Sequence, residues 1–159
     1  MKKLFFIVAM FATAFVQQIF AQDTQKETQL SQLLHSYYDI KDALVAGNAV
    51  TASLKAADFV KHLNGIDVKL ISLDNSTALL KDATHISESK DIKHQREHFA
   101  NFSTNMFALA KSVKLTSDPI YEAYCPMKKA YWLSSDKVIK NPYFGSAMLT
   151  CGSIKETLK

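Results

Sequence analysis

Residues 91–114, with the sequence DIKHQREHFANFSTNMFALAKSVK, give the clearest indication of the fold class of this chain. Its apolar residues recur mostly every three or four positions, which places their side chains on one face of an α-helix. That apolar stripe consists of Ile92, Phe99, Phe102, Met106, Leu109 and Val113. Neither proline nor glycine interrupts the stretch. It therefore predicts a long amphipathic helix that buries this stripe.

The same periodicity extends upstream over three further segments. The first segment has an apolar face and ends at Gly47-Asn48, a pair typical of helix C-termini. That face comprises Leu30, Leu33, Leu34, Tyr37, Ile40 and Leu44. The second helix is expected from about residue 49 to Gly65. Its expected core face comprises Val50, Leu54, Ala57, Val60 and Leu63.

A third helix is expected to begin at a cap formed by Asn75 or Ser76, after a mixed apolar run at residues 68–73. Its apolar residues are Leu79, Leu80, Ala83 and Ile86. Four amphipathic helices with short connections predict an antiparallel four-helix bundle. The fold class is therefore mainly α.

The sequence changes character after Asp118-Pro119. Residues 120–124 alternate weakly between apolar and polar, residues 131–133 form a short apolar run, and Asn141-Pro142 begins a turn. We expect residues 119–159 to form an irregular cap or a small β-hairpin, closed by a helical turn at residues 153–158.

The N-terminus predicts export from the cytoplasm. Lys2 and Lys3 precede an apolar run at residues 4–16, and Ala21 provides a small residue at a cleavage position. The run is short for a bilayer-spanning helix, which disfavours the alternative of an uncleaved membrane anchor. We expect a signal peptide at residues 1–21 and a single domain at residues 22–159 that is periplasmic or secreted, with no membrane span after cleavage.

Charge and motifs exclude several classes of function. The net charge is +4, and two of the lysines, Lys2 and Lys3, belong to the predicted signal peptide. No basic run exceeds two residues, so a nucleic-acid partner is not expected. The sequence lacks a nucleophile elbow, a phosphate-binding loop, a dinucleotide-binding glycine motif and a C-x-x-C pair. We therefore do not expect an enzyme.

Four sulfur-containing residues of the cap form a candidate metal site. Cys125 and Met127 lie in one half of the cap, and Met148 and Cys151 lie in the other. Thiolate and thioether ligands select Cu(I) among biological metals. The alternative is a disulfide between Cys125 and Cys151, because two cysteines in an exported protein are commonly paired. Such a bridge would contribute about 3 kcal/mol by closing the loop between them.

Two histidines of the most periodic helix form a second candidate. His94 and His98 are four residues apart and share one helix face, as paired metal ligands require. Together with Glu97 they match the H-x-x-E-H signature of one class of zinc protease, but the chain is small and offers no obvious third ligand. The alternative is that both histidines are solvated or hydrogen-bonded. The remaining histidines, which carry no prediction, are His35, His62 and His85.

Five motifs in combination resemble a known family. They are HQREHF at residues 94–99, YCPM at 124–127, WLS at 132–134, NPYFG at 141–145 and MLTCG at 148–152. The combination is similar to a bacterial periplasmic domain-of-unknown-function family. That family occurs alone behind a signal peptide or fused to the CusB-like periplasmic adaptor subunits of heavy-metal efflux pumps. The residues from 37 to 67 resemble its first helical hairpin.

The resemblance implies a role in heavy-metal handling. It favours a metal site as strongly as a disulfide at the sulfur-containing residues of the cap, which are Cys125, Met127, Met148 and Cys151. The thiolate and disulfide forms would then be two states of one site. His94 and His98 could complete this site if the cap packs against the fourth helix, and mixed sulfur and imidazole ligands suit Cu(I) or, as second choice, Zn(II).

Two hypotheses therefore remain for the function. The first is an exported protein that binds a soft metal, copper first, and buffers it or passes it to an efflux system. The alternative is an interaction module without metal, closed by a Cys125–Cys151 disulfide, that docks on an efflux adaptor or another envelope protein.

Overall fold

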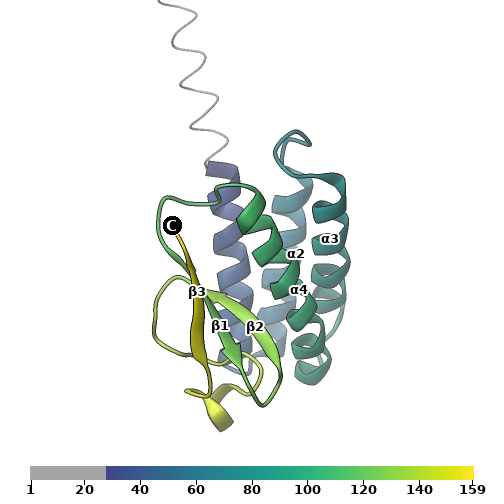
Figure 1. Cartoon of the computed structure of the whole chain (residues 1–159). Helices are drawn as coiled ribbons and strands as arrows, with labels where there is room; N and C mark the ends of the chain where they lie inside the picture. The colour runs from purple at the N-terminus through teal and green to yellow at the C-terminus, as the bar shows by residue number, and fades with distance from the viewer. Residues whose placement is uncertain (1–27) are drawn as a thin grey trace, which may run out of the picture.

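A computed structural model describes residues 28–159, which form helices followed by a small sheet (Figure 1). The first helix covers residues 28–45, and it is followed by α2 (Ala49–Asn64), α3 (Leu73–Glu88) and α4 (Ile92–Ser112). The C-terminal part contains β1 (Ile120–Cys125), β2 (Ala130–Ser134), the 3-10 helix η1 (Gly145–Met148) and β3 (Ser153–Leu158). The predicted class, mainly α with a C-terminal cap, is confirmed. The predicted signal peptide at residues 1–21 lies outside the described residues.

Polar side chains define where the helices begin. Asn48 Oδ1 accepts a hydrogen bond from Thr51 N–H at the start of α2, and Asp91 Oδ1 accepts one from Lys93 N–H at the start of α4. Ser72 caps α3, which therefore begins earlier than the cap expected at residue 75 or 76. None of the helices in residues 28–159 is both long and apolar enough to cross a membrane.

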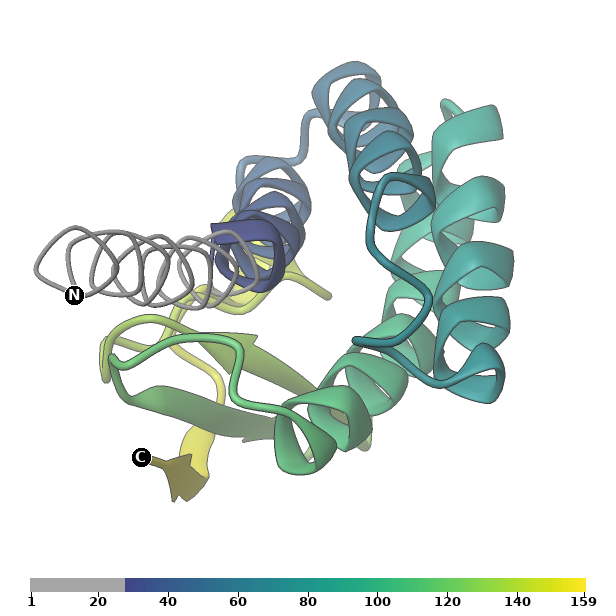
Figure 2. The ribbon, with the colours of Figure 1, turned by 90° about the horizontal axis from the view of Figure 1, so that it is seen from above.

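The four helices follow one another in an arc, and the sheet lies between the first helix and α4 (Figure 2). In this arrangement α3 packs against both α2 and α4, and β2 packs against α4. The short connection between α3 and α4 makes these two helices antiparallel neighbours. This pairing positions the histidines described below.

Aromatic side chains join the first helix, α4 and the sheet. The rings of Tyr37 and Phe99 stack with their centroids 5.3 Å apart, and both side chains are fully buried. The Tyr37 hydroxyl shares a hydrogen bond of 2.8 Å with Ser103 of α4 and accepts another of 3.0 Å from the backbone N–H of Leu133 in β2. The cap is thereby anchored to the helices through one buried hydroxyl.

The cap is a three-stranded antiparallel sheet of order β2-β1-β3. The predicted hairpin corresponds to β1 and β2, with Tyr124 opposite Tyr131. The helical turn predicted at residues 153–158 is wrong, because these residues form β3. Their side chains alternate between exposed and half-buried, and β1 supplies the backbone partners that an isolated segment lacks.

The predicted core face of α2 is also partly wrong. Val50 is 54% exposed and Leu54 is 63% exposed. The buried residues of this helix are instead Ala52, Ala56, Phe59 and Leu63. Phe59 packs edge-on against Phe102 of α4 at 4.8 Å, and Ala52 and Ala56 are fully buried. Burial of this aromatic ring therefore sets the rotation of α2.

Candidate metal centre

Three histidines from two neighbouring helices form the centre of the candidate site. His85 lies in the last turn of α3, whereas His94 and His98 lie in the first two turns of α4. Only a short connection separates the two helices, so the chain brings His85 beside the face that carries His94 and His98. The predicted pair is thus extended by a third imidazole.

The three imidazoles are close enough to share one ion. One ligand nitrogen from each can be chosen so that all lie within 4.8 Å of one another. The His85 and His98 rings stack with centroids 4.3 Å apart, and the His94 and His98 rings meet at 4.6 Å. His85 is exposed, while His94 and His98 are half-buried. The cluster can therefore exchange a ligand with solvent.

The buried carboxylate of Asp82 lies beside the His98 ring. Asp82 Oδ1 lies 3.4 Å from His98 Nδ1, and Asp82 Oδ2 accepts a hydrogen bond of 3.2 Å from Asn105 Nδ2. Asp82 is buried, and it lies one turn before His85 on α3. A carboxylate that accepts from Nδ1 holds the imidazole in the tautomer whose Nε2 is free to bind a metal.

Buried polar contacts hold the turn between α3 and α4 in place. Gln95 is fully buried, and its amide Nε2 lies within hydrogen-bond distance of the carbonyl oxygens of Ala49, Ile86 and Ser89. One amide thus joins the start of α2, the end of α3 and the first turn of α4. This connection fixes the axial position of α4 relative to α3, which the three-histidine cluster requires.

Glu97 lies outside the three-histidine cluster. It is exposed on α4, and the only cluster of three or more His, Cys, Asp or Glu ligands within residues 28–159 contains the three histidines alone. A general base would have to lie beside the ion.

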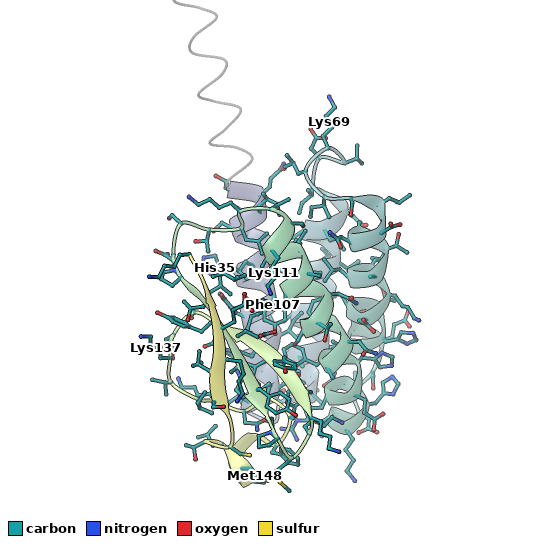
Figure 3. The ribbon with its side chains drawn as sticks, in the orientation of Figure 1. His35, Lys69, Phe107, Lys111, Lys137 and Met148 are labelled. Carbon is teal, nitrogen blue, oxygen red and sulfur yellow. The ribbon has the colours of Figure 1, made fainter. Side chains whose placement is uncertain are left out.

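The two cysteines lie together in the cap as free thiols. Cys125 ends β1 and is fully buried, whereas Cys151 precedes β3 and is half-buried. Their Sγ atoms are 3.8 Å apart, so they are neighbours without a covalent bond. Met127 is 65% exposed, and Met148 is half-buried at the end of η1, at the lower tip of the cap (Figure 3).

The predicted ligands are therefore distributed over two places. No three-ligand cluster within residues 28–159 includes a cysteine, so the histidines and the thiols do not form the single mixed site that we considered. The participation of Met127 and Met148 in metal binding stays a prediction.

The environment of Cys151 favours the neutral thiol. Burial raises the pKa of the Cys151 thiol, and both the hydrogen bond and the charge of Cys125 raise it further. A hydrogen bond from the Met127 backbone acts in the opposite direction. Two thiolates at this distance would repel each other unless a cation lay between them.

His85 and Asp82 are the members of the site that sequence reasoning missed. The one available signal was their spacing of three residues on the expected third helix, which places both on one face. That spacing does not say which neighbouring helix the face meets.

Comparison with known proteins gives one family. The family described as "Protein of unknown function (DUF3347)" matches residues 33–118, which include the whole three-histidine cluster. Neither the curated proteins nor the solved structures include a significant match to this chain.

Proposed function

The chain belongs to the DUF3347 family, and we propose that this member binds a transition-metal ion through His85, His94 and His98. The observation that carries the proposal is the convergence of three imidazole nitrogens within 4.8 Å from two helices. Neutral imidazole is the commonest metal-ligating side chain, and two of these ligands are paired at the four-residue spacing of one helix face.

The contact between Asp82 and His98 supports metal binding by the cluster. The alternative is that the three histidines lie near one another on the surface without a shared role. A carboxylate bonded to the second nitrogen of a ligating histidine fixes the ring and raises its basicity. Asp82 is held in turn by Asn105, so the orientation of the His98 ring is determined from within the protein.

The ligand set suits both copper and zinc, of which we propose copper first and zinc second. Three imidazoles without a carboxylate in direct contact suit copper and zinc more than magnesium or calcium, which prefer oxygen ligands. Three protein ligands also leave a coordination position open for water or for a transfer partner. His85 is exposed, so the ion would be reachable from solvent on its side.

The cellular role we propose is heavy-metal handling outside the cytoplasm. Its support is the basic and apolar N-terminus and the resemblance to domains that occur with heavy-metal efflux adaptors. The protein would buffer the ion or pass it to an efflux adaptor or another periplasmic protein.

Titration of the purified protein with Cu(II) and with Zn(II) tests the proposal. We expect one-to-one binding that weakens at least tenfold in His94→Ala, a loss of about 1.4 kcal/mol. The matched control is His35→Ala, because His35 is exposed on the first helix and lies far from α3 (Figure 3). Equal losses in both variants, or unchanged binding in His94→Ala, would contradict the assignment to this cluster.

A further inference from the structure

The cysteine pair carries an inference that does not depend on the histidine site. Cys125 and Cys151 come from segments 26 residues apart, and the fold brings their sulfur atoms to 3.8 Å. Three separate features of the cap hold them there, and each belongs to a different segment.

The first feature is the turn between β1 and β2. Lys129 N–H donates to Cys125 O at 2.8 Å, and Lys129 itself adopts a positive φ of 56°. In this turn the backbone N–H of Lys128 points at Cys125 Sγ, with a distance of 3.5 Å. Backbone N–H donors to sulfur stabilise the negative charge of a thiolate, and such bonds surround protein-bound metal–thiolate groups.

The second feature is the buried side chain of Asn141. Its Nδ2 donates to Cys151 O at 2.7 Å, and its Oδ1 accepts from Tyr143 N–H at 2.8 Å. The backbone N–H of Asn141 donates to Leu149 O at 2.8 Å. Asn141 therefore fixes the backbone of Cys151 from the opposite end of the loop.

The third feature is Gly152, which lets the chain pass close to the core. A Cβ atom at this position would lie 2.6 Å from the Trp132 ring and 3.0 Å from Tyr124 O, at a φ of +154°. Only glycine fits here without displacement of a buried tryptophan. Because Gly152 lies so close to Trp132 and Tyr124, the neighbouring Cys151 lies next to Cys125 at the end of β1.

We propose that Cys125 and Cys151 form a second metal site, which binds one Cu(I) ion between their two sulfur atoms. Sulfur ligands at about 2.3 Å from one ion are about 3.8 Å apart at a tetrahedral angle and about 4.6 Å apart when linear. The observed 3.8 Å equals the tetrahedral value, so a linear two-coordinate ion would need the two sulfur atoms to move about 0.8 Å apart. On binding, each thiol releases its proton to solvent, and the two resulting thiolates share the cation.

The small number of ligands favours Cu(I) over zinc. Structural zinc requires four ligands, yet no third His, Cys, Asp or Glu joins this pair within residues 28–159. Cu(I) accepts low coordination numbers and prefers thiolates. The site therefore differs from the three-histidine cluster in ligand type, coordination number and preferred oxidation state.

Anaerobic titration of the reduced protein with Cu(I), against a chromogenic Cu(I) chelator, tests this second site. We expect one ion bound by sulfur, as seen by X-ray absorption, and a loss of at least about a hundredfold in affinity in Cys151→Ser. Ser153→Ala, an exposed change two residues away, is the matched control and should bind as the wild type does. Cys151 is chosen because it is half-buried, whereas Cys125 is fully buried.

The His94→Ala variant separates this inference from the proposed function. It should keep the sulfur-bound Cu(I) even though its Cu(II) or Zn(II) binding is impaired. Thermal unfolding without metal checks that Cys151→Ser still folds. The inference is overturned if folded Cys151→Ser binds Cu(I) as tightly as the wild type, or if the wild-type ion has no sulfur neighbours.

Discussion

The two candidate sites of this protein differ in how the chain builds them. The histidine cluster uses two consecutive helices joined by a short turn, and its ligands are at most 13 positions apart, from His85 to His98. The cysteine pair uses the last residue of β1 and a residue shortly before β3, 26 positions apart, aligned by a turn, a buried amide and a glycine. The first site should therefore tolerate changes in the cap, whereas the second should fail whenever the cap is distorted.

The largest expected effect comes from Gly152→Ala. The new methyl group would meet Trp132 and Tyr124 O, so we expect a loss of about 3 kcal/mol in unfolding free energy, from overpacking and backbone strain. Chemical denaturation measures this loss. Cu(I) binding at the cysteines should fall with it, while Zn(II) binding at the histidines persists in the folded fraction. Equal loss at both sites would show that the two regions are not independent.

Asp82→Asn is expected to impair the histidine site and to spare the cysteine pair. The amide keeps the shape of Asp82 but removes the charge that orients His98, so Zn(II) affinity should fall about 10- to 100-fold. Cu(I) affinity at the cysteines should not change. Isothermal titration with each ion separates the two effects. Asn105→Ala, which removes only the partner of Asp82, should weaken Zn(II) binding less.

Tyr37→Phe weakens the link between the helices and the cap. Removal of the hydroxyl leaves the buried N–H of Leu133 without its acceptor, and we expect a loss of about 1–2 kcal/mol. Hydrogen exchange at Leu133 should accelerate more than exchange at the histidine-bearing turns of α4. Uniform acceleration along the chain would mean that helices and cap unfold as one unit.

The smallest effect is expected from Glu122→Gln, within the sheet. Burial raises the pKa of the Glu122 carboxyl, and the facing Glu156 raises it further, whereas Lys111 lowers it. The favourable contribution of the protonated form is present below the unfolded pKa of about 4.3 and is lost as the pH rises through the higher folded value. We expect Glu122→Gln to be more stable than the wild type at pH 7, by up to about 1 kcal/mol.

Unfolding free energies measured from pH 4 to pH 7 check the sign of this effect. The advantage of Glu122→Gln should shrink on acidification, because the wild-type carboxyl then becomes neutral as well. An advantage that grows toward pH 4 would contradict the raised pKa. Zn(II) and Cu(I) affinities at pH 7 should match those of the wild type.

Much of the helical part was predictable because its signals are local. The predicted stripe residues Phe99, Phe102, Met106 and Leu109 are all buried on α4, and the glycine stop at Gly47 matches the end of the first helix. The rotation of α2 was not predictable from period alone, because Val50 and Leu54 fit a helical face as well as Ala52 and Ala56 do. The position of Phe59 between its neighbours decided which face was buried.

Four amphipathic helices, a distinct C-terminal cap and the pairing of His94 with His98 on one helix face could all be inferred from the amino-acid sequence alone. These follow from chain-local physics, namely helical period, capping and backbone restriction by proline and glycine. The folded arrangement was needed to show that His85 and Asp82 join that pair, that residues 153–158 form a strand, and that Cys125 lies next to Cys151. Each of these depends on which surfaces pack together, and packing is a property of the whole chain.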